Sequence, residues 1–164
     1  MQAFGLVRAA FGADLTLVGD GPQGLLDIGA SMSQIAVVRG GITRFVRILP
    51  TGGAQFTEAL MSGASLSRED AEERMRSVGV VASGLPEGDD EPAALRRLLT
   101  RTADGLIEEI RGSVNYYLTQ AGEHSLERLV VCGNGARLPH LANRVARALG
   151  TRVEPVRVLD HVSV

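Results

Sequence analysis

The sequence predicts an α/β fold, in which a three-stranded antiparallel meander is extended by further strands and helices pack on the sheet. Three short apolar runs predict the meander, at residues 25–28, 35–38 and 42–48. Gly40 and Gly41 separate the last two runs, and a glycine pair between apolar runs is a strong hairpin signal. Apolar residues then recur at intervals of three and four, which predicts helices. A strand, a helix and a last strand are predicted from residue 129 onward.

Local signals place the first elements. Residues 2–12 have helical spacing, and only residues 30–33 link the first two strands, so those strands are antiparallel neighbours. A helix over residues 54–62 follows the meander. A second helix begins at Ser67, carries carboxylates in its first turn, where they suit the helix dipole, and stops at Gly79.

The longest predicted helix begins at Pro92, a residue suited to the first helical position, and ends near Gly122. Gly105 and Gly112 lie inside it, and each weakens the helix by about 1 kcal/mol relative to Ala unless a neighbour packs there. The remaining elements are a strand over residues 129–131, a helix from Pro139 to Leu149 and a strand from Arg152 to Val158.

Composition excludes several classes of function. The formal net charge of the 164 residues is −2, which gives no bulk electrostatic attraction for nucleic acid or for anionic lipid. All 17 basic residues are Arg. The lone Cys132 forms no internal disulfide, so we expect a reducing compartment. The three histidines lack the spacing of metal ligands. No apolar run reaches the ~18 residues of a membrane span, and no signal peptide is visible. The sequence therefore predicts a cytosolic protein.

The segment LLDIGAS, residues 25–31, is the first that can carry chemistry. Its strand ends near Asp27, and Gly29, Ala30 and Ser31 then form a sharp turn of small residues. Such turns bring backbone N–H groups close to an anion, and Asp27 is suited to hold Mg²⁺ through a water. The alternative is a plain glycine turn whose Asp bonds its own backbone.

The segment VVCGNGARLPHL, residues 130–141, is a second candidate. A strand leads into a loop with Gly133 and Gly135, against which a nucleotide can lie, and the planar Arg137 can stack on a base. Leu138 stands where a third glycine would complete a dinucleotide-binding fingerprint, so that fold is disfavoured. The alternative is an ordinary strand-to-helix turn, and Cys132 is interpreted as a small hydrophobic residue.

Two more segments are weaker candidates. Gly52 and Gly53 lie between a strand and a helix, where the chain can pass near a phosphate or simply turn. Residues 71–79 place Glu72 and Arg76 on a charged helix face, which is usually only a solvated surface.

Five segments in series nevertheless resemble actin-like (ribonuclease H-like) ATPases, and within them the PilM family of type IV pilus assembly proteins. The resemblance runs from about Ala9 to Val158. The segments are DIGAS, GGAQFTEAL, SREDAEERMRSVG, EEIRGSVNYYL and VVCGNGARLPHLANRVARALGTRVEPV.

The resemblance implies a site for ATP and Mg²⁺. The phosphate and metal contacts it implies are Asp27 (to the metal through water), Gly29, Ala30, Ser31, Gly52 and Gly53. The adenosine contacts it implies are Glu72, Arg76, Gly133, Gly135, Ala136 and Arg137. Met75 stands where related helices carry a Lys that touches the nucleotide, so this chain lacks that one polar contact.

The resemblance also implies an organisation. The chain corresponds to the second half of an actin-like fold, with a linking helix and loop at 1–23, a nucleotide-binding subdomain at 24–62 and 127–159, and a helical insertion at 63–126. The first phosphate motif is absent, so we expect a fragment, a truncated product or a chain completed by another protein. We expect at most weak ATPase activity in a full-length form.

The partners implied are the inner-membrane protein PilN, docked on the missing half, and the pilus motor ATPases. The location implied is cytoplasmic, peripheral to the inner membrane through partners, without direct membrane insertion or nucleic-acid binding. Alternatives within the superfamily are a sugar-kinase-like enzyme, an FtsA-like cell-division protein and a type II secretion protein. The strand-like end RVEPVRVLDHVSV disfavours FtsA, which carries an amphipathic membrane helix there.

Overall fold

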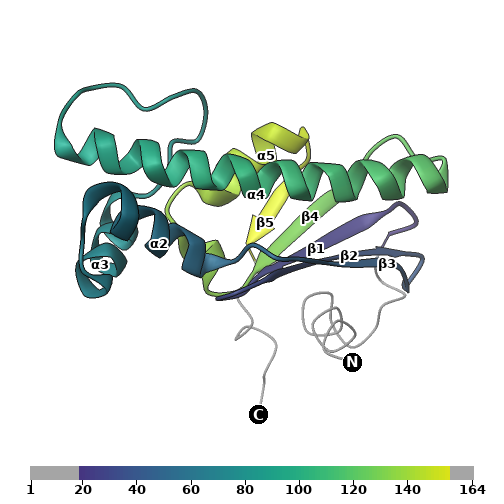
Figure 1. Cartoon of the computed structure of the whole chain (residues 1–164). Helices are drawn as coiled ribbons and strands as arrows, with labels where there is room; N and C mark the ends of the chain where they lie inside the picture. Colours follow the sequence, from purple (N-terminus) through teal and green to yellow (C-terminus); the bar gives the residue numbers. More distant parts are fainter. Residues whose placement is uncertain (1–18, 156–164) are drawn as a thin grey trace, which may run out of the picture.

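A single mixed sheet of five strands organises the computed structural model, which describes residues 19–155 (Figure 1). The strands are β1 (Gln23–Ile28), β2 (Ser33–Arg39), β3 (Ile42–Leu49), β4 (Arg128–Cys132) and β5 (Val153–Pro155), in the spatial order β3-β2-β1-β4-β5. β1, β2 and β3 pair antiparallel, which confirms the predicted meander. β4 pairs parallel to both β1 and β5.

Four helices of the described chain pack with this sheet. They are α2 (Gly53–Ala64), α3 (Arg68–Val78), α4 (Glu91–Ala121) and α5 (Leu141–Leu149). The Ser67 hydroxyl accepts the N–H of Asp70 and so caps α3, while Asp90 caps α4 in the same way through the N–H of Ala93. Gly122, with φ 66°, ends α4 in the left-handed conformation that glycine adopts without strain.

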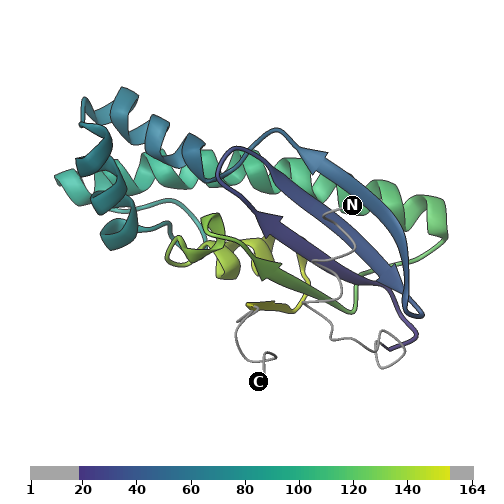
Figure 2. The ribbon, with the colours of Figure 1, turned by 90° about the horizontal axis from the view of Figure 1, so that it is seen from below.

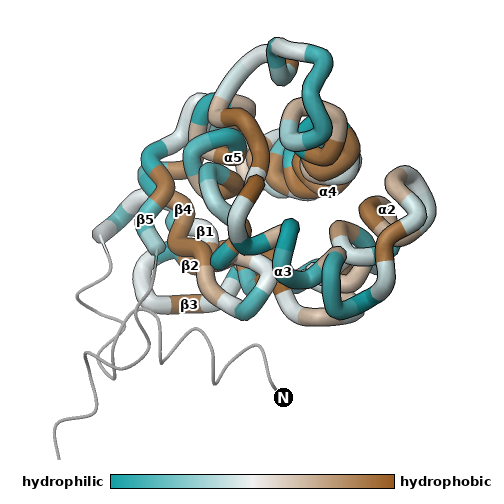
Figure 3. The backbone as a smooth tube through the Cα atoms, turned by 90° about the vertical axis from the view of Figure 1, so that its left-hand side faces the viewer, coloured by the Kyte–Doolittle hydropathy of each residue, from teal (hydrophilic) through white to brown (hydrophobic). Residues whose placement is uncertain are grey.

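The helices form a layer on one face of the sheet. Figures 1 and 2 show α4 and α5 over this face, with α2, α3 and the first part of α4 extending past the end of the strands. Leu26 and Ile28 of β1 pack into the same core as Leu106 and Ile110 of α4. Figure 3 shows α3 mainly hydrophilic, and only Ala71 of this helix is buried, so α3 touches the core along a narrow stripe.

Two elements near the end of the described chain differ from the predicted bounds. The helix predicted from Pro139 begins instead at Leu141, because His140 takes φ 66° and the Pro139 carbonyl accepts the N–H of Val80 at 3.1 Å. The last strand covers Val153–Pro155, so it begins one residue after the predicted Arg152. Residues 156–158 of its predicted span, like the predicted helix at 2–12, lie outside the described residues.

No atom lies within 4 Å of a Cβ placed at either Gly105 or Gly112, so no neighbour explains these two helix glycines. Among residues 19–155, no helix combines the length and the apolar character needed to cross a lipid bilayer.

Candidate functional site

Three turns meet at one end of the sheet. β1 and β4 are parallel, and β3 runs in the same direction because it is antiparallel to β2, so the three strands end at the same edge. The N–H groups of Gly53 and Ala54 bond to the carbonyls of Gly29 and Ala30 at 2.8 and 2.7 Å. A Cβ at Gly53 would lie 3.5 Å from Gly135 Cα. The structure therefore brings residues 29–31, 52–54 and 133–137 together.

Glycine is required where these turns touch. A Cβ at Gly52 would lie 2.7 Å from the Ala30 carbonyl oxygen, and one at Gly133, which has φ 91°, would overlap the carbonyl of Ile28. A Cβ at Gly135 would overlap the Ile28 side chain. These three glycines are thus needed for turn-to-turn packing, whether or not a ligand approaches.

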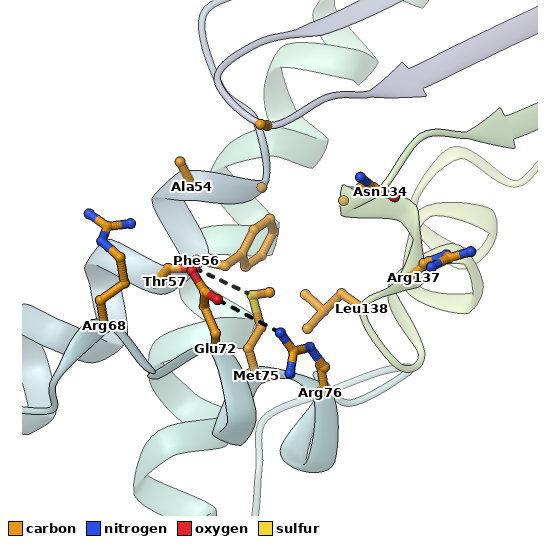
Figure 4. A pocket seen from close by; sticks show the side chains of 13 residues that line it. Ala54, Phe56, Thr57, Arg68, Glu72, Met75, Arg76, Asn134, Arg137 and Leu138 are labelled. Atoms are coloured by element: carbon orange, nitrogen blue, oxygen red, sulfur yellow. Dashed lines mark hydrogen bonds and ion pairs between the residues drawn. The ribbon is translucent and has the colours of Figure 1, made fainter. Parts of the chain in front are cut away.

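A cavity of about 540 Å³ opens beside the joined turns, between α2 and α3 on one side and residues 134–138 on the other (Figure 4). Phe56 of α2, Met75 of α3 and Leu138 give it an apolar floor. The Thr57 hydroxyl lies 3.9 Å from the Met75 sulfur, so the two helices meet within this wall. A concave site with an apolar floor and a few polar groups suits a small ligand with a flat, apolar part.

The charges around the cavity favour an anion. Arg68, Arg76 and Arg137 line it together with one carboxylate, that of Glu72. Arg76 and Glu72 form an ion pair with an N···O distance of 3.7 Å. No described residue forms an ion pair or hydrogen bond with the side chain of Arg68 or Arg137, so both guanidinium groups remain available to a ligand.

The structure places the twelve predicted site residues in two groups. Six line the cavity: Ala30, Gly53, Glu72, Arg76, Gly135 and Arg137. The other six, which are Asp27, Gly29, Ser31, Gly52, Gly133 and Ala136, belong to or adjoin the same turns without lining it. The sequence reading missed Ala54, Phe56, Thr57, Arg68, Asn134 and Leu138 as lining residues. Three of these, Ala54, Asn134 and Leu138, lie next to predicted ones in the chain. Phe56 was assigned only to an apolar helix face, and Thr57 and Arg68 carried no signal.

Asp27 points away from the helix layer. Its neighbours in β1, Leu26 and Ile28, belong to the core beneath α4, and alternate side chains of a strand point to opposite faces. Asp27 pairs in register with Cys132 of β4. Burial, followed by the charge of Asp27 and a hydrogen bond to it, raises the pKa of the Cys132 thiol to about 12, so Cys132 is no nucleophile at neutral pH. Within residues 19–155, no group of three potential metal-ligating side chains lies together.

Comparison with solved structures identifies the fold. A structure of the PilM–PilN type IV pilus biogenesis complex superposes with TM-score 0.76 and 27% identity, over 93% of this chain and 41% of that one. The ethanolamine utilization protein EutJ from Carboxydothermus hydrogenoformans gives TM-score 0.65 at 20% identity, over 91% of this chain and 47% of that one. MreB5 of Spiroplasma citri, bound to AMPPNP, gives 0.66 at 14% identity, over 92% and 52%.

At 20% and 14% identity, the last two similarities show the fold alone, and that fold is actin-like. The chain spans about half the length, or less, of these matched structures. The model of the family described as type IV pilus assembly protein PilM matches residues 18–164, nearly the whole chain. The chain therefore belongs to the PilM family of type IV pilus assembly proteins.

Proposed function

We propose that this chain binds ATP with Mg²⁺ at the joined turns, as a component of type IV pilus assembly. The observation that carries the proposal is the cavity itself, with its apolar floor, its excess of guanidinium groups and its position at the glycine turns of three strand ends. One structural neighbour, MreB5 of Spiroplasma citri, is a protein bound to AMPPNP.

The apolar floor suits the base. Phe56, Met75 and Leu138 provide a surface against which adenine can lie, and Arg137 can stack on it from the opposite wall. The Glu72 carboxylate can accept hydrogen bonds from ribose hydroxyls, and its ion pair with Arg76 keeps it in place. Met75 adds apolar area at the position where a Lys would add a charge.

Phosphate binding must use fewer backbone donors than the glycine turns suggest. Gly53 and Ala54 already donate their N–H groups to the carbonyls of the 29–31 turn, so the start of α2 offers neither to a phosphate. Ala30 and Ser31 donate to no other described group, and we propose their N–H groups as the phosphate donors. Arg68 and Arg76 add positive charge nearby.

Asp27 is the proposed metal contact, through water. Because no cluster of ligating side chains accompanies it in the described chain, Mg²⁺ would depend mainly on phosphate oxygens and waters, as Mg²⁺ commonly does. Bound there, Mg²⁺ would neutralise phosphate charge. Asp27 therefore matters only when the ligand carries a polyphosphate.

The wider role is proposed from the family. The PilM–PilN complex suggests PilN as a partner, with its docking surface in the part of PilM that this chain does not cover. We also propose contact with the pilus motor ATPases, a cytoplasmic position at the inner membrane, and the subdomain division at residues 24–62 with 127–159 and 63–126. We propose at most weak ATP hydrolysis.

The test is a titration of the ¹⁵N-labelled chain with ATP·Mg²⁺ and with AMP. We expect weak binding that shifts the amide resonances of residues 53–57 and 134–138. Arg137→Ala should abolish these shifts, whereas Arg101→Ala, which removes an exposed guanidinium of α4, should leave them intact. Asp27→Ala should weaken ATP·Mg²⁺ but not AMP. If the wild type shows no resonance shifts with ATP·Mg²⁺, or if Arg137→Ala shows the same shifts as the wild type, the proposed site is wrong.

A further inference from the structure

Among residues 19–155, no element covers the edge of the sheet formed by β3. It is the outermost strand, and of the described strands its eight residues pair with β2 alone (Figure 2). No other described group bonds to the backbone of residues 42–49, so every second residue turns its N–H and C=O outward. The opposite edge of the sheet is formed by β5, described over Val153–Pro155.

The two faces of this edge differ in chemistry. Val46 and Ile48 pair with Ala36 and Gln34, on the face opposite the helix layer, and they are 41% and 61% exposed. This face of the edge is therefore apolar.

The face toward α4 is cationic and aromatic. Arg47 pairs with Ile35 of the core, which places it on the helix side, and it is exposed. Arg44, at the bulge in the β2–β3 register, borders the same surface hollow as Tyr117. Neither arginine forms an ion pair with a described residue. Phe45 lies 6.1 Å, centroid to centroid, from the exposed Tyr116.

We propose that the β3 edge binds an extended acidic segment of a partner protein by strand addition, the segment alternating carboxylates with apolar side chains. Successive side chains of a strand point to opposite faces, so one such segment would present its carboxylates to Arg44 and Arg47 and its apolar residues to Val46 and Ile48. Main-chain hydrogen bonds would supply affinity, and the alternation would supply specificity.

Charge argues against a second copy of this chain as the occupant. In an antiparallel pairing of two β3 strands about their centres, Arg44 of each copy would lie opposite Arg47 of the other, and like charges facing each other across strands are destabilising. The arginines therefore protect the edge against self-association and select an acidic strand.

The test uses the whole chain and two eight-residue peptides, one alternating Val with Glu and one alternating Val with Lys. We expect the Val/Glu peptide to bind and to slow hydrogen exchange at amides within residues 42–49. Arg47→Glu should lower its affinity about tenfold and make the Val/Lys peptide the better ligand. Arg101→Glu is the matched control, with the same charge change on an exposed part of α4, and should change neither affinity.

Four results would overturn the proposal. These are no binding of the Val/Glu peptide at millimolar concentration, equal binding of both peptides, protection confined to residues outside 42–49, and a dimer in sedimentation whose formation protects β3. The nucleotide titration is independent, since the cavity and the β3 edge share no residue.

Discussion

The adjacent glycines before and at the start of α2 should respond to alanine in opposite ways. A Cβ at Gly52 would lie 2.7 Å from both the Ala30 carbonyl oxygen and the Met32 nitrogen, and 2.8 Å from the Gly29 carbonyl oxygen. All three are backbone atoms, so the 29–32 turn would have to move. The φ of Gly52 is −142°, which any residue adopts, so the cost of Gly52→Ala is steric.

Overpacking of this kind costs about 1–3 kcal/mol, and each kcal/mol lowers the Tm of a domain this size by about 2–4 °C. A Cβ at Gly53 instead meets its nearest atoms at 3.5 Å, an ordinary contact distance. Alanine is also the better helix former, so Gly53→Ala should be neutral or stabilising by less than about 1 kcal/mol.

Urea denaturation followed by circular dichroism measures both variants against the wild type. Gly53→Ala should also weaken nucleotide binding without loss of stability, since its new methyl group would sit in the cavity wall between Gly29 and Gly135. Equal unfolding free energies for Gly52→Ala and the wild type, or equal losses in both variants, would refute the reasoning from turn packing.

Other parts of the chain give further predictions. Gly105→Ala and Gly112→Ala should each raise the unfolding free energy by about 0.5–1 kcal/mol, because no atom opposes the new Cβ; thermal denaturation tests this. Arg144→Ala should lower the unfolding free energy by about 1–3 kcal/mol in urea denaturation. It removes hydrogen bonds from the guanidinium to the half-exposed Asp104, at 2.7 and 2.9 Å, and to two backbone carbonyls. Asp104→Asn should lower the unfolding free energy by less. Cys132, with its pKa raised from 9.0 to about 12, should react with a thiol reagent at pH 8 only after unfolding. The folded state holds this proton more tightly than the unfolded state, so stability should fall as pH rises from about 9 toward 12.

Sequence reasoning worked best where a signal was local. Gly40 and Gly41 both take positive φ in the β2–β3 turn, as a hairpin glycine pair should, and the meander followed from them. The parallel pairing of β1 with β4 joins strands about 100 residues apart, and no local pattern encodes it. The sequence predicted that further strands extend the meander, but not that β4 pairs with β1.

The candidate site likewise combines features that local sequence signals predict with features that depend on tertiary packing. Glycine turns mark strand ends in the sequence, and the structure brings the turns together, but the cavity walls depend on how α2 and α3 pack. Phe56 has the same apolar periodicity as a core residue and is both buried and a wall of the cavity. Arg68 faces the cavity only because α3 folds back beside α2, a tertiary arrangement that its neighbours in sequence do not predict.

The long helix α4 extends from beside the cavity wall formed by α2 to the β3 edge of the sheet. Its 31 residues span about 46 Å, and its one proline stands in the first turn, where it does not kink the axis. The N-terminal part of α4 packs against α2, where a Cβ at Gly63 would meet Leu98, and its far part carries Tyr116 and Tyr117 against Phe45. One continuous helix therefore packs against α2 beside the cavity at one end of the sheet and against Phe45 of the edge strand at the other.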